Sequence, residues 1–96
     1  MSTILEREMG VSHKDFFRTL PPAMGPFSYR LENQAVVAEH QGRHLRIELG
    51  PEQERRIALL HIPYTHVRFT FADGFDTTAI DTFMKYFESR FQRGGG

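Results

Sequence analysis

The chain has 96 residues, of which 40% are hydrophobic, and this length predicts one domain with a modest core. Twelve basic and twelve acidic residues give no net charge, which argues against partners such as nucleic acid or an anionic membrane. The absence of cysteine excludes disulfides, thiolate nucleophiles and cysteine-ligated metal centres.

The first ten residues carry few apolar positions among charged ones. They contain no apolar run of the length of a signal peptide. We expect residues 1–10 to be flexible, with Gly10 as the boundary of a single domain over residues 11–93. No segment of the chain approaches the length needed to span a bilayer, so we expect a cytoplasmic protein.

A short helix is predicted to begin at Ser12. Asp15 stands three residues later, in the position of a capping box. The apolar side of this helix consists of Phe16, Phe17 and Leu20. Pro21-Pro22 should end it, because the residue before a proline avoids the helical region and a proline cannot donate a hydrogen bond.

Residues 27–49 alternate between apolar and polar side chains, which predicts three strands of an antiparallel meander. Two-residue turns at Asn33-Gln34 and Gln41-Gly42 would connect these strands. The turns place Leu31 opposite Val36, Tyr29 opposite Ala38, Ala38 opposite Leu45, and Val36 opposite Ile47. A slip of one residue would break this agreement between apolar positions, so the register supports the assignment.

The segment from residue 50 to residue 62 leaves two alternatives. Pro51 and the acidic residues that follow it fit either a loop that leads into a strand or the first turn of a helix. The run from Arg55 to Ile62 is too continuously apolar for an amphipathic pattern of either period. We favour a strand, which Pro63 should end.

The C-terminal third of the chain predicts one strand and one helix. Residues 66–71 alternate as a strand does, and Asp73-Gly74 indicates a turn. Asp76 or Thr77 can cap the final helix. Its apolar stripe at helical spacing consists of Ile80, Phe83, Met84, Phe87 and Phe91. Residues 94–96, all glycine, should end the helix and form a flexible tail.

Together these elements predict an α+β fold. The sheet should be a single antiparallel meander of four to five strands, with an N-terminal and a C-terminal helix packed on one face. The aromatic stripe of the final helix needs an apolar surface, and the inward face of the sheet is the available one. The other face of the sheet should meet water or a partner.

Three segments of the chain resemble a group of short uncharacterised bacterial proteins. They are HKDFFRTLP at residues 13–21, GPEQERRI at residues 50–57 and FQRGGG at residues 91–96. The resemblance covers most of residues 13–96. It implies that the whole chain is the usual unit of this group and that the glycine ending belongs to the protein, but it implies no activity.

Five histidines raise the question of a metal site. Ligands on a sheet must lie on one face of neighbouring strands, and the register places His40 on the buried face and His44 on the open face. His61 and His66 could pair on the open face across a turn at Pro63-Tyr64, with His44 nearby. No spacing matches a known zinc pattern, so we expect no metal and no cofactor, with His44, His61 and His66 as weak candidate ligands.

The sequence contains no catalytic motif. No nucleophile-elbow pattern surrounds any serine or threonine, and the carboxylates fall at positions typical of sheet surfaces and turns. The only glycine run is terminal and precedes no helix, so it cannot form a phosphate-binding loop. We therefore expect that the protein is not an enzyme.

The open face of the predicted sheet is the best candidate binding surface. The strand aromatics that could stack on RNA bases fall on the inner face, which argues against nucleic acid. A face of mixed charge with some aliphatic surface is typical of contact with a protein or a second copy. The candidate binding residues are Arg30, Val37, His44, Arg46, His66 and Arg68.

We therefore expect a non-enzymatic protein-interaction or self-association module that uses the open face or the edge of its sheet. We expect no nucleic-acid or membrane partner. One alternative is a carrier of a small apolar ligand, bound in a cavity between the helices and the sheet. A less favoured alternative is a metal protein that uses the histidines.

Overall fold

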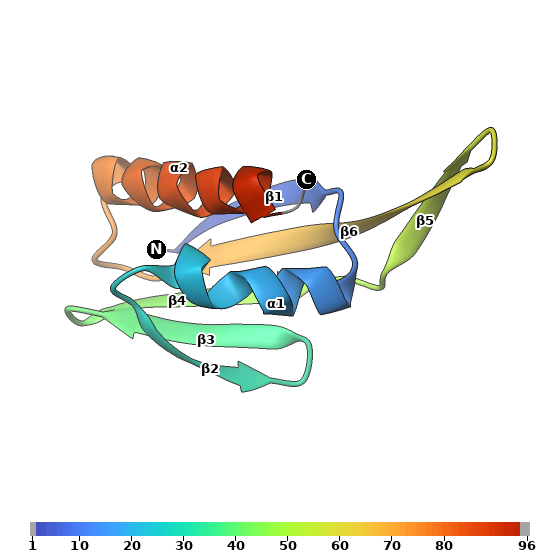
Figure 1. Cartoon of the computed structure of the whole chain (residues 1–96). Helices are drawn as coiled ribbons and strands as arrows, with labels where there is room; N and C mark the ends of the chain where they lie inside the picture. The colour runs from blue at the N-terminus through green and yellow to red at the C-terminus, as the bar shows by residue number, and fades with distance from the viewer. Residues whose placement is uncertain (1, 95–96) are drawn as a thin grey trace.

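The computed structural model of the chain describes residues 2–94. Six strands and two helices make up this part of the chain (Figure 1). In chain order they are β1 (Thr3–Met9), α1 (His13–Met24), β2 (Ser28–Glu32), β3 (Ala35–His40), β4 (Arg43–Leu49), β5 (Gln53–Ile57), β6 (Leu60–Phe71) and α2 (Thr77–Gly94). Within residues 2–94, neither helix combines the length and the apolar character that a membrane span requires.

The strands form one open antiparallel sheet, so the predicted α+β class is confirmed. The strand order is β1-β6-β4-β3-β2, and β5 pairs with β6 outside this path. The sheet has six strands, whereas the pattern predicted four to five. The sheet also departs from a pure meander, because β1 crosses over to pair with β6.

The prediction of a flexible segment over residues 1–10 is wrong for β1. This strand pairs with β6 along its whole length, from Thr3 opposite Phe71 to Met9 opposite Thr65. Its inward side chains include Leu5 and Met9, which pack against the core. The local pattern of β1 is weak because β1 is an edge strand whose residues are mostly exposed. Met1 lies outside the described residues.

The hairpins β2–β3 and β3–β4 have the predicted register. The observed pairs are Leu31 with Val36, Tyr29 with Ala38, Ala38 with Leu45, and Val36 with Ile47. Both turns contain positive φ angles, 56° at Asn33, 55° at Gln41 and 77° at Gly42. Glycine and asparagine tolerate this region of backbone space, so the turn residues themselves support the register.

The prediction that Pro21-Pro22 ends the first helix is wrong, because α1 continues to Met24. The missing proline N–H groups cost two backbone hydrogen bonds within this helix. Ala23 and Met24, which follow the prolines, are both fully buried in the core. Their burial favours the last helical turn, and Gly25 then leaves the helix with a φ of 58°.

Both predicted helix caps are present. The Oγ of Ser12 accepts a hydrogen bond from the backbone N of Asp15 at 3.1 Å. At the start of α2, the Oδ1 of Asp76 accepts one from the backbone N of Ala79 at 2.7 Å. Gly94 is the last residue of α2, and not the first of a flexible tail. The last two glycines lie outside the described residues.

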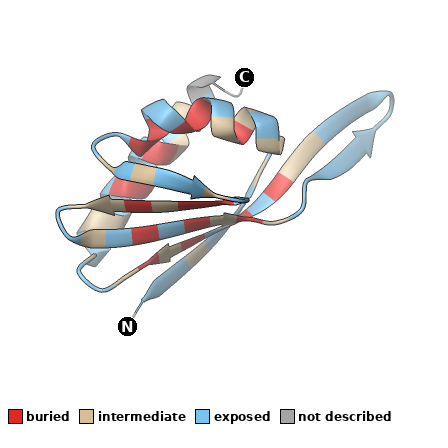
Figure 2. Cartoon of the chain, turned by 90° about the horizontal axis from the view of Figure 1, so that it is seen from below, coloured by how far each residue is buried: buried red, intermediate tan, exposed pale blue. Residues whose placement is uncertain are grey.

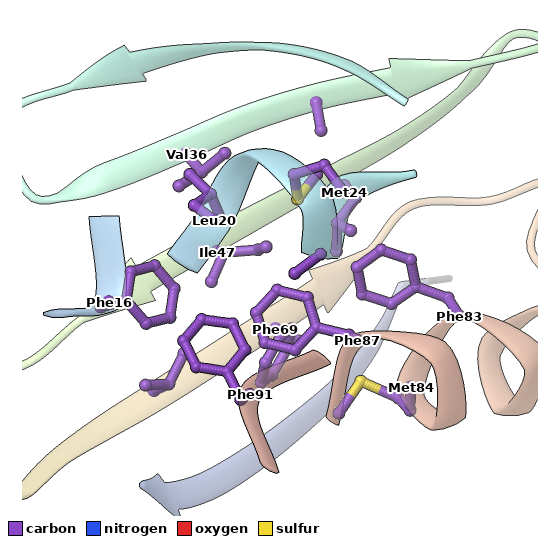
Figure 3. Close-up of a cluster of buried hydrophobic side chains, with 14 of the residues drawn as sticks. Phe16, Leu20, Met24, Val36, Ile47, Phe69, Phe83, Met84, Phe87 and Phe91 are labelled. Atoms are coloured by element: carbon purple, nitrogen blue, oxygen red, sulfur yellow. The ribbon is translucent and has the colours of Figure 1, made fainter. Parts of the chain in front are cut away.

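The core lies between the two helices and the inward face of the sheet. Phe16 of α1 and Phe87 of α2 approach within 6.1 Å between ring centroids, and both belong to one cluster with the sheet residues Val36, Ile47 and Phe69 (Figure 3). Buried and exposed residues alternate along the central strands (Figure 2). The aromatic stripe of α2 therefore covers the face that the strand pattern predicted to be apolar.

The prediction of a strand from Arg55 to Ile62 that ends at Pro63 is wrong. The chain instead reverses at Ala58-Leu59, so β5 and the start of β6 form a hairpin. β6 then continues without a break through Pro63 to Phe71, a length of 12 residues. The preference for strand over helix in this segment is confirmed.

Leu31 marks the limit of the inward face. The alternation places it with the core residues, but it is 54% exposed because β2 is an edge strand of the sheet. Leu45, in the inner strand β4, is 2% exposed. Two leucines on the same face of one sheet therefore differ widely in burial.

Replacement of these leucines by alanine should have different costs. Leu45→Ala should lower the free energy of unfolding by about 2–5 kcal/mol, because it leaves a cavity in the core. Leu31→Ala, the matched control, should lower it by less than about 1 kcal/mol. Urea denaturation followed by circular dichroism measures both values. Equal losses would contradict the burial described for these two strands.

Candidate functional site

A β-hairpin projects from the body of the molecule (Figure 1). We call residues 53–64 the arm; they comprise β5, its turn and the first part of β6. The molecule measures 46 × 24 × 23 Å, and the arm extends along its long axis. Every residue from 51 to 62 is exposed, as the pale blue hairpin shows (Figure 2). Such a segment contributes nothing to the core.

One face of the arm is aliphatic. Residues that pair directly in a hairpin share a face, so the pair of Ile57 with Leu60 lies beside Ile62, the partner of Arg55. Ile57 is 53% exposed, Leu60 62% and Ile62 38%, and Leu59 in the turn reaches 93%. In the described part of the chain, these are four of the seven exposed large hydrophobic residues. The arm therefore carries the main apolar patch of this surface.

The opposite face of the arm is charged. One oxygen of Glu54 accepts a hydrogen bond from the Nδ1 of His61 at 2.9 Å and contacts the Nε of Arg56 at 3.5 Å. His61 must carry its proton on Nδ1 to make this bond. The hydrogen bond from His61, together with the weaker contact to Arg56, lowers the pKa of Glu54. The charged groups of Glu54, His61 and Arg56 on this face thus already contact one another within the arm.

The base of the arm is tied to the body of the protein. The backbone N of His13, at the start of α1, donates to the Oε1 of Glu52 at 2.7 Å. The His13 ring donates from Nε2 to the carbonyl of Gly50 at 2.7 Å, which requires the proton on Nε2. Arg55 adds an ion pair with Glu8 of β1 at 2.8 Å. These contacts hold the direction in which the arm projects.

The turn of the arm has an unusual composition. Ala58 has a φ of 55°, in the region that glycine and asparagine usually occupy in two-residue hairpin turns. A left-handed conformation costs a residue with a side chain about 1–2 kcal/mol. The turn therefore combines a strained backbone with the most exposed leucine of the described residues, and neither feature helps the hairpin to form.

Pro63 makes one edge of the arm less able to pair with a further strand. No strand of the described chain pairs with residues 60–64 on the edge away from β5. The two-residue turn makes Ile57 and Leu60 a hydrogen-bonded pair, so alternation makes Glu54 and Pro63 a non-hydrogen-bonded pair. The nitrogen of Pro63 thus points to the free edge and removes a donor that an added strand would need. This edge favours contact through side chains over strand addition.

The six residues proposed for the open face do lie together on one face of the sheet. Val37 of β3 lies opposite both Arg30 of β2 and Arg46 of β4. Arg68 of β6 lies opposite Glu48 of β4. The remaining two members, His44 and His66, follow the same alternation along β4 and β6 and are exposed. The register of the sheet therefore brings the predicted set together.

The charges on this open face are paired with one another. Arg46 lies 3.6 Å from Glu32 and 3.4 Å from Glu48, and Arg68 lies 3.8 Å from Glu6. Exposed pairs of this kind contribute about 0–1 kcal/mol each. Among the described residues, the part of this face outside the arm carries no group of exposed aliphatic side chains like that of the arm. Its use as a binding surface stays a prediction.

The turn at Pro63-Tyr64 across which His61 and His66 could have paired is absent from the described residues. Pro63-Tyr64 is not a turn but part of β6, so the strand itself separates the two histidines. Five positions along a strand also place them on opposite faces. His44 lies in β4, opposite Glu39. Within residues 2–94, no three histidine or carboxylate side chains lie close enough to hold a metal ion.

An apolar cleft lies at the end of the molecule away from the arm. It has a volume of about 540 Å³ and is formed by the end of α1, the β3–β4 turn and the start of α2. The main apolar lining consists of Met24, Phe27, Phe75, Ala79, Phe83 and Tyr86. The Arg43 guanidinium lies over the ring of Phe75, 6.0 Å from its centroid. This cleft is the feature nearest to the predicted cavity between helices and sheet.

The sequence interpretation missed the arm because its turn carries no usual turn residue. The uncharged run from Ile57 to Leu60 contains neither glycine nor asparagine. The one available signal was an apolar run that fits no amphipathic period and lies between two prolines, Pro51 and Pro63.

No protein-family model matches the chain, and neither a curated protein nor a solved structure matches it.

The lowered pKa of Glu54 predicts a local response of the arm to pH. A carboxyl group with a lowered pKa contributes stability above its unfolded-state pKa and loses it as the pH falls through the folded-state pKa. The contact between Glu54 and His61 should therefore be present at neutral pH and be lost on acidification. Carboxyl-detected NMR spectra over a pH series measure this titration.

Substitution of the two partners tests which contact lowers the pKa of Glu54. His61→Gln should move the Glu54 titration back towards its ordinary value, because the hydrogen bond from His61 is the largest cause of the shift. Arg56→Gln is the matched control and should move it less. A larger change for Arg56→Gln would show that the ion pair with Arg56, and not the histidine, dominates.

Proposed function

We propose that the protein is a non-enzymatic self-association module and that the arm is its contact element. The observation that carries this proposal is the group of four exposed aliphatic residues on a projecting hairpin. Contiguous apolar patches on a protein surface are typical of interaction sites. The fixed base of the arm supports this role, because an element held in one direction loses less entropy on binding.

A second copy of the chain is the partner that the charge distribution favours. The chain carries no net charge, so two copies do not repel each other at long range. The tip of the arm, residues 57–60, contains no charged residue and would need no oppositely charged partner surface. Association through such a tip depends on apolar contact, which a second copy can supply.

The energy available from the arm favours a complex that contains two arms. A fully buried leucine or isoleucine contributes about 2 kcal/mol, so the exposed parts of these four residues amount to on the order of 5 kcal/mol. A dissociation constant of 1 µM corresponds to about 8 kcal/mol, and association itself costs several kcal/mol. One arm is therefore insufficient, whereas a symmetric dimer uses two. We expect a dissociation constant of about 10 µM to 1 mM.

The arm continues the surface that the sequence pattern singled out. Ile62 and Tyr64 alternate with the inward residues of β6 in the same way as His66, and the Tyr64 and His66 rings lie 6.1 Å apart. The aliphatic face of the arm is thus an extension of the open face of the sheet. Self-association would therefore use the open face that the sequence pattern predicted, with the arm at the centre of the contact.

Removal of the aliphatic surface of the arm should weaken self-association. The triple variant Ile57→Thr, Leu59→Ser and Ile62→Thr keeps β-branched residues in both strands, so the hairpin should still form. We expect the dissociation constant to rise by at least about tenfold, because about half of the apolar contact is lost. Sedimentation equilibrium over a concentration series measures this constant.

A leucine outside the arm provides the control. Leu31→Thr removes an exposed apolar side chain from the edge strand β2 and should leave the dissociation constant unchanged. Circular dichroism should show the same strand content for both variants. A wild-type protein that stays monomeric at a concentration of about 1 mM would overturn the proposed function.

A further inference from the structure

The arm and the apolar cleft lie at opposite ends of the same strand. β6 begins at the tip of the arm with Leu60 and ends with Phe71, whose ring lies 5.1 Å from that of Phe75 in the lining of the cleft. A strand of 12 residues spans roughly 36 Å along its axis. The arm therefore cannot reach the cleft of its own chain (Figure 1).

The tip of the arm and the cleft match in chemistry. The tip is uncharged and aliphatic, and the cleft is lined mainly by aromatic and aliphatic side chains. Its volume of about 540 Å³ lies within the usual range of pockets that hold apolar groups. Arg43 and His40 stand among the lining residues, but the tip would bring no further charge into the cleft. Docking would therefore bury apolar surface without carrying a charge of the tip into the cleft.

The placement of the two features at opposite ends favours a twofold arrangement. When two elongated copies lie side by side in opposite directions, the arm of each copy lies at the end that holds the cleft of the other. A twofold axis then makes every contact occur twice and closes the assembly at two chains. This arrangement supplies the two arms that the energy of association requires.

Resting on the proposed self-association, we infer that the arm of each copy docks in the apolar cleft of the other in a reciprocal dimer. Leu59, the most exposed large hydrophobic residue of the arm, enters the cleft of the partner near Ala79 and Thr82 of α2. The charged face of the arm, with its ion pairs around Glu54, stays towards solvent.

Engineered cysteines test this contact directly, because the natural chain contains none. The Leu59→Cys and Ala79→Cys variants are mixed, oxidised and analysed by mass spectrometry under non-reducing conditions. A disulfide requires the two Cβ atoms to lie within about 4.5 Å, so Thr82→Cys serves as a second position on the same helix. We expect a disulfide between Leu59→Cys and at least one of the two cleft variants.

The control pair replaces the cleft position with Leu31→Cys, an exposed residue outside the cleft. Cross-linking of Leu59→Cys to this control as fast as to the cleft variants would overturn the inference. A disulfide formed only between two copies of Leu59→Cys would also overturn it, because the arms would then meet tip to tip. In both cases the dimer itself would persist, and the proposed function would stand.

The twofold symmetry of the proposed dimer can be tested by the size of the covalent product that a double cysteine variant forms. The double variant Leu59→Cys, Ala79→Cys should give a closed covalent dimer with two disulfides, whereas open-ended chains of covalent oligomers would overturn the reciprocal arrangement.

Ala79→Trp should fill the cleft and raise the dissociation constant by about tenfold or more, and an unchanged constant would overturn the docking site. Failure of the wild-type protein to dimerise at all would instead remove the proposed function.

Discussion

The pairing of β6 with three other strands is the constraint on which the rest of the structure depends. Residues 65–71 of this strand pair with β1, and β4 pairs along residues 67–71, so their inward side chains form the floor of the core. Residues 60–64 pair with β5 and form half of the arm. Thr65 lies at the junction, fully buried, and its Oγ1 donates to the carbonyl of Val11 at 2.9 Å. The arm is therefore a continuation of the central sheet, and the packing of the body sets its direction.

The parts of the fold that could be predicted from the sequence are those with local causes. The register of β2 to β4 follows from two short turns and period-two alternation, and the helix α2 follows from a capped stripe at helical spacing. The parts that could not be predicted depend on distant partners. β1 has little pattern of its own, and the turn of α1 after Pro21-Pro22 depends on the burial of Ala23 and Met24. Tertiary packing there outweighs the local preference of the backbone.

The candidate site shows the same division between local and distant causes. The open-face residues, and the acids Glu32 and Glu48 that pair with Arg46, could be placed on one face from alternation alone. The acids that β1 supplies could not. Glu6 pairs with Arg68, and Glu8 pairs with Arg55. Both acids come from β1, and their positions depend on the pairing of β1 with β6, which no local sequence pattern indicates. The arm was missed because Ala58 occupies a left-handed turn position where glycine or asparagine would have indicated a hairpin.

The pairing of β1 with β6 has a consequence for the order in which the chain folds during its synthesis. β1 is synthesised before its partner, which is complete only when Phe71 has been made. A contact between segments so far apart in sequence forms slowly, because most of the chain must be closed into a loop. Until then β1 stays an unpaired strand of seven residues. The charged run Glu6-Arg7-Glu8 protects it in this interval, because charges disfavour pairing with the exposed strands of other nascent chains.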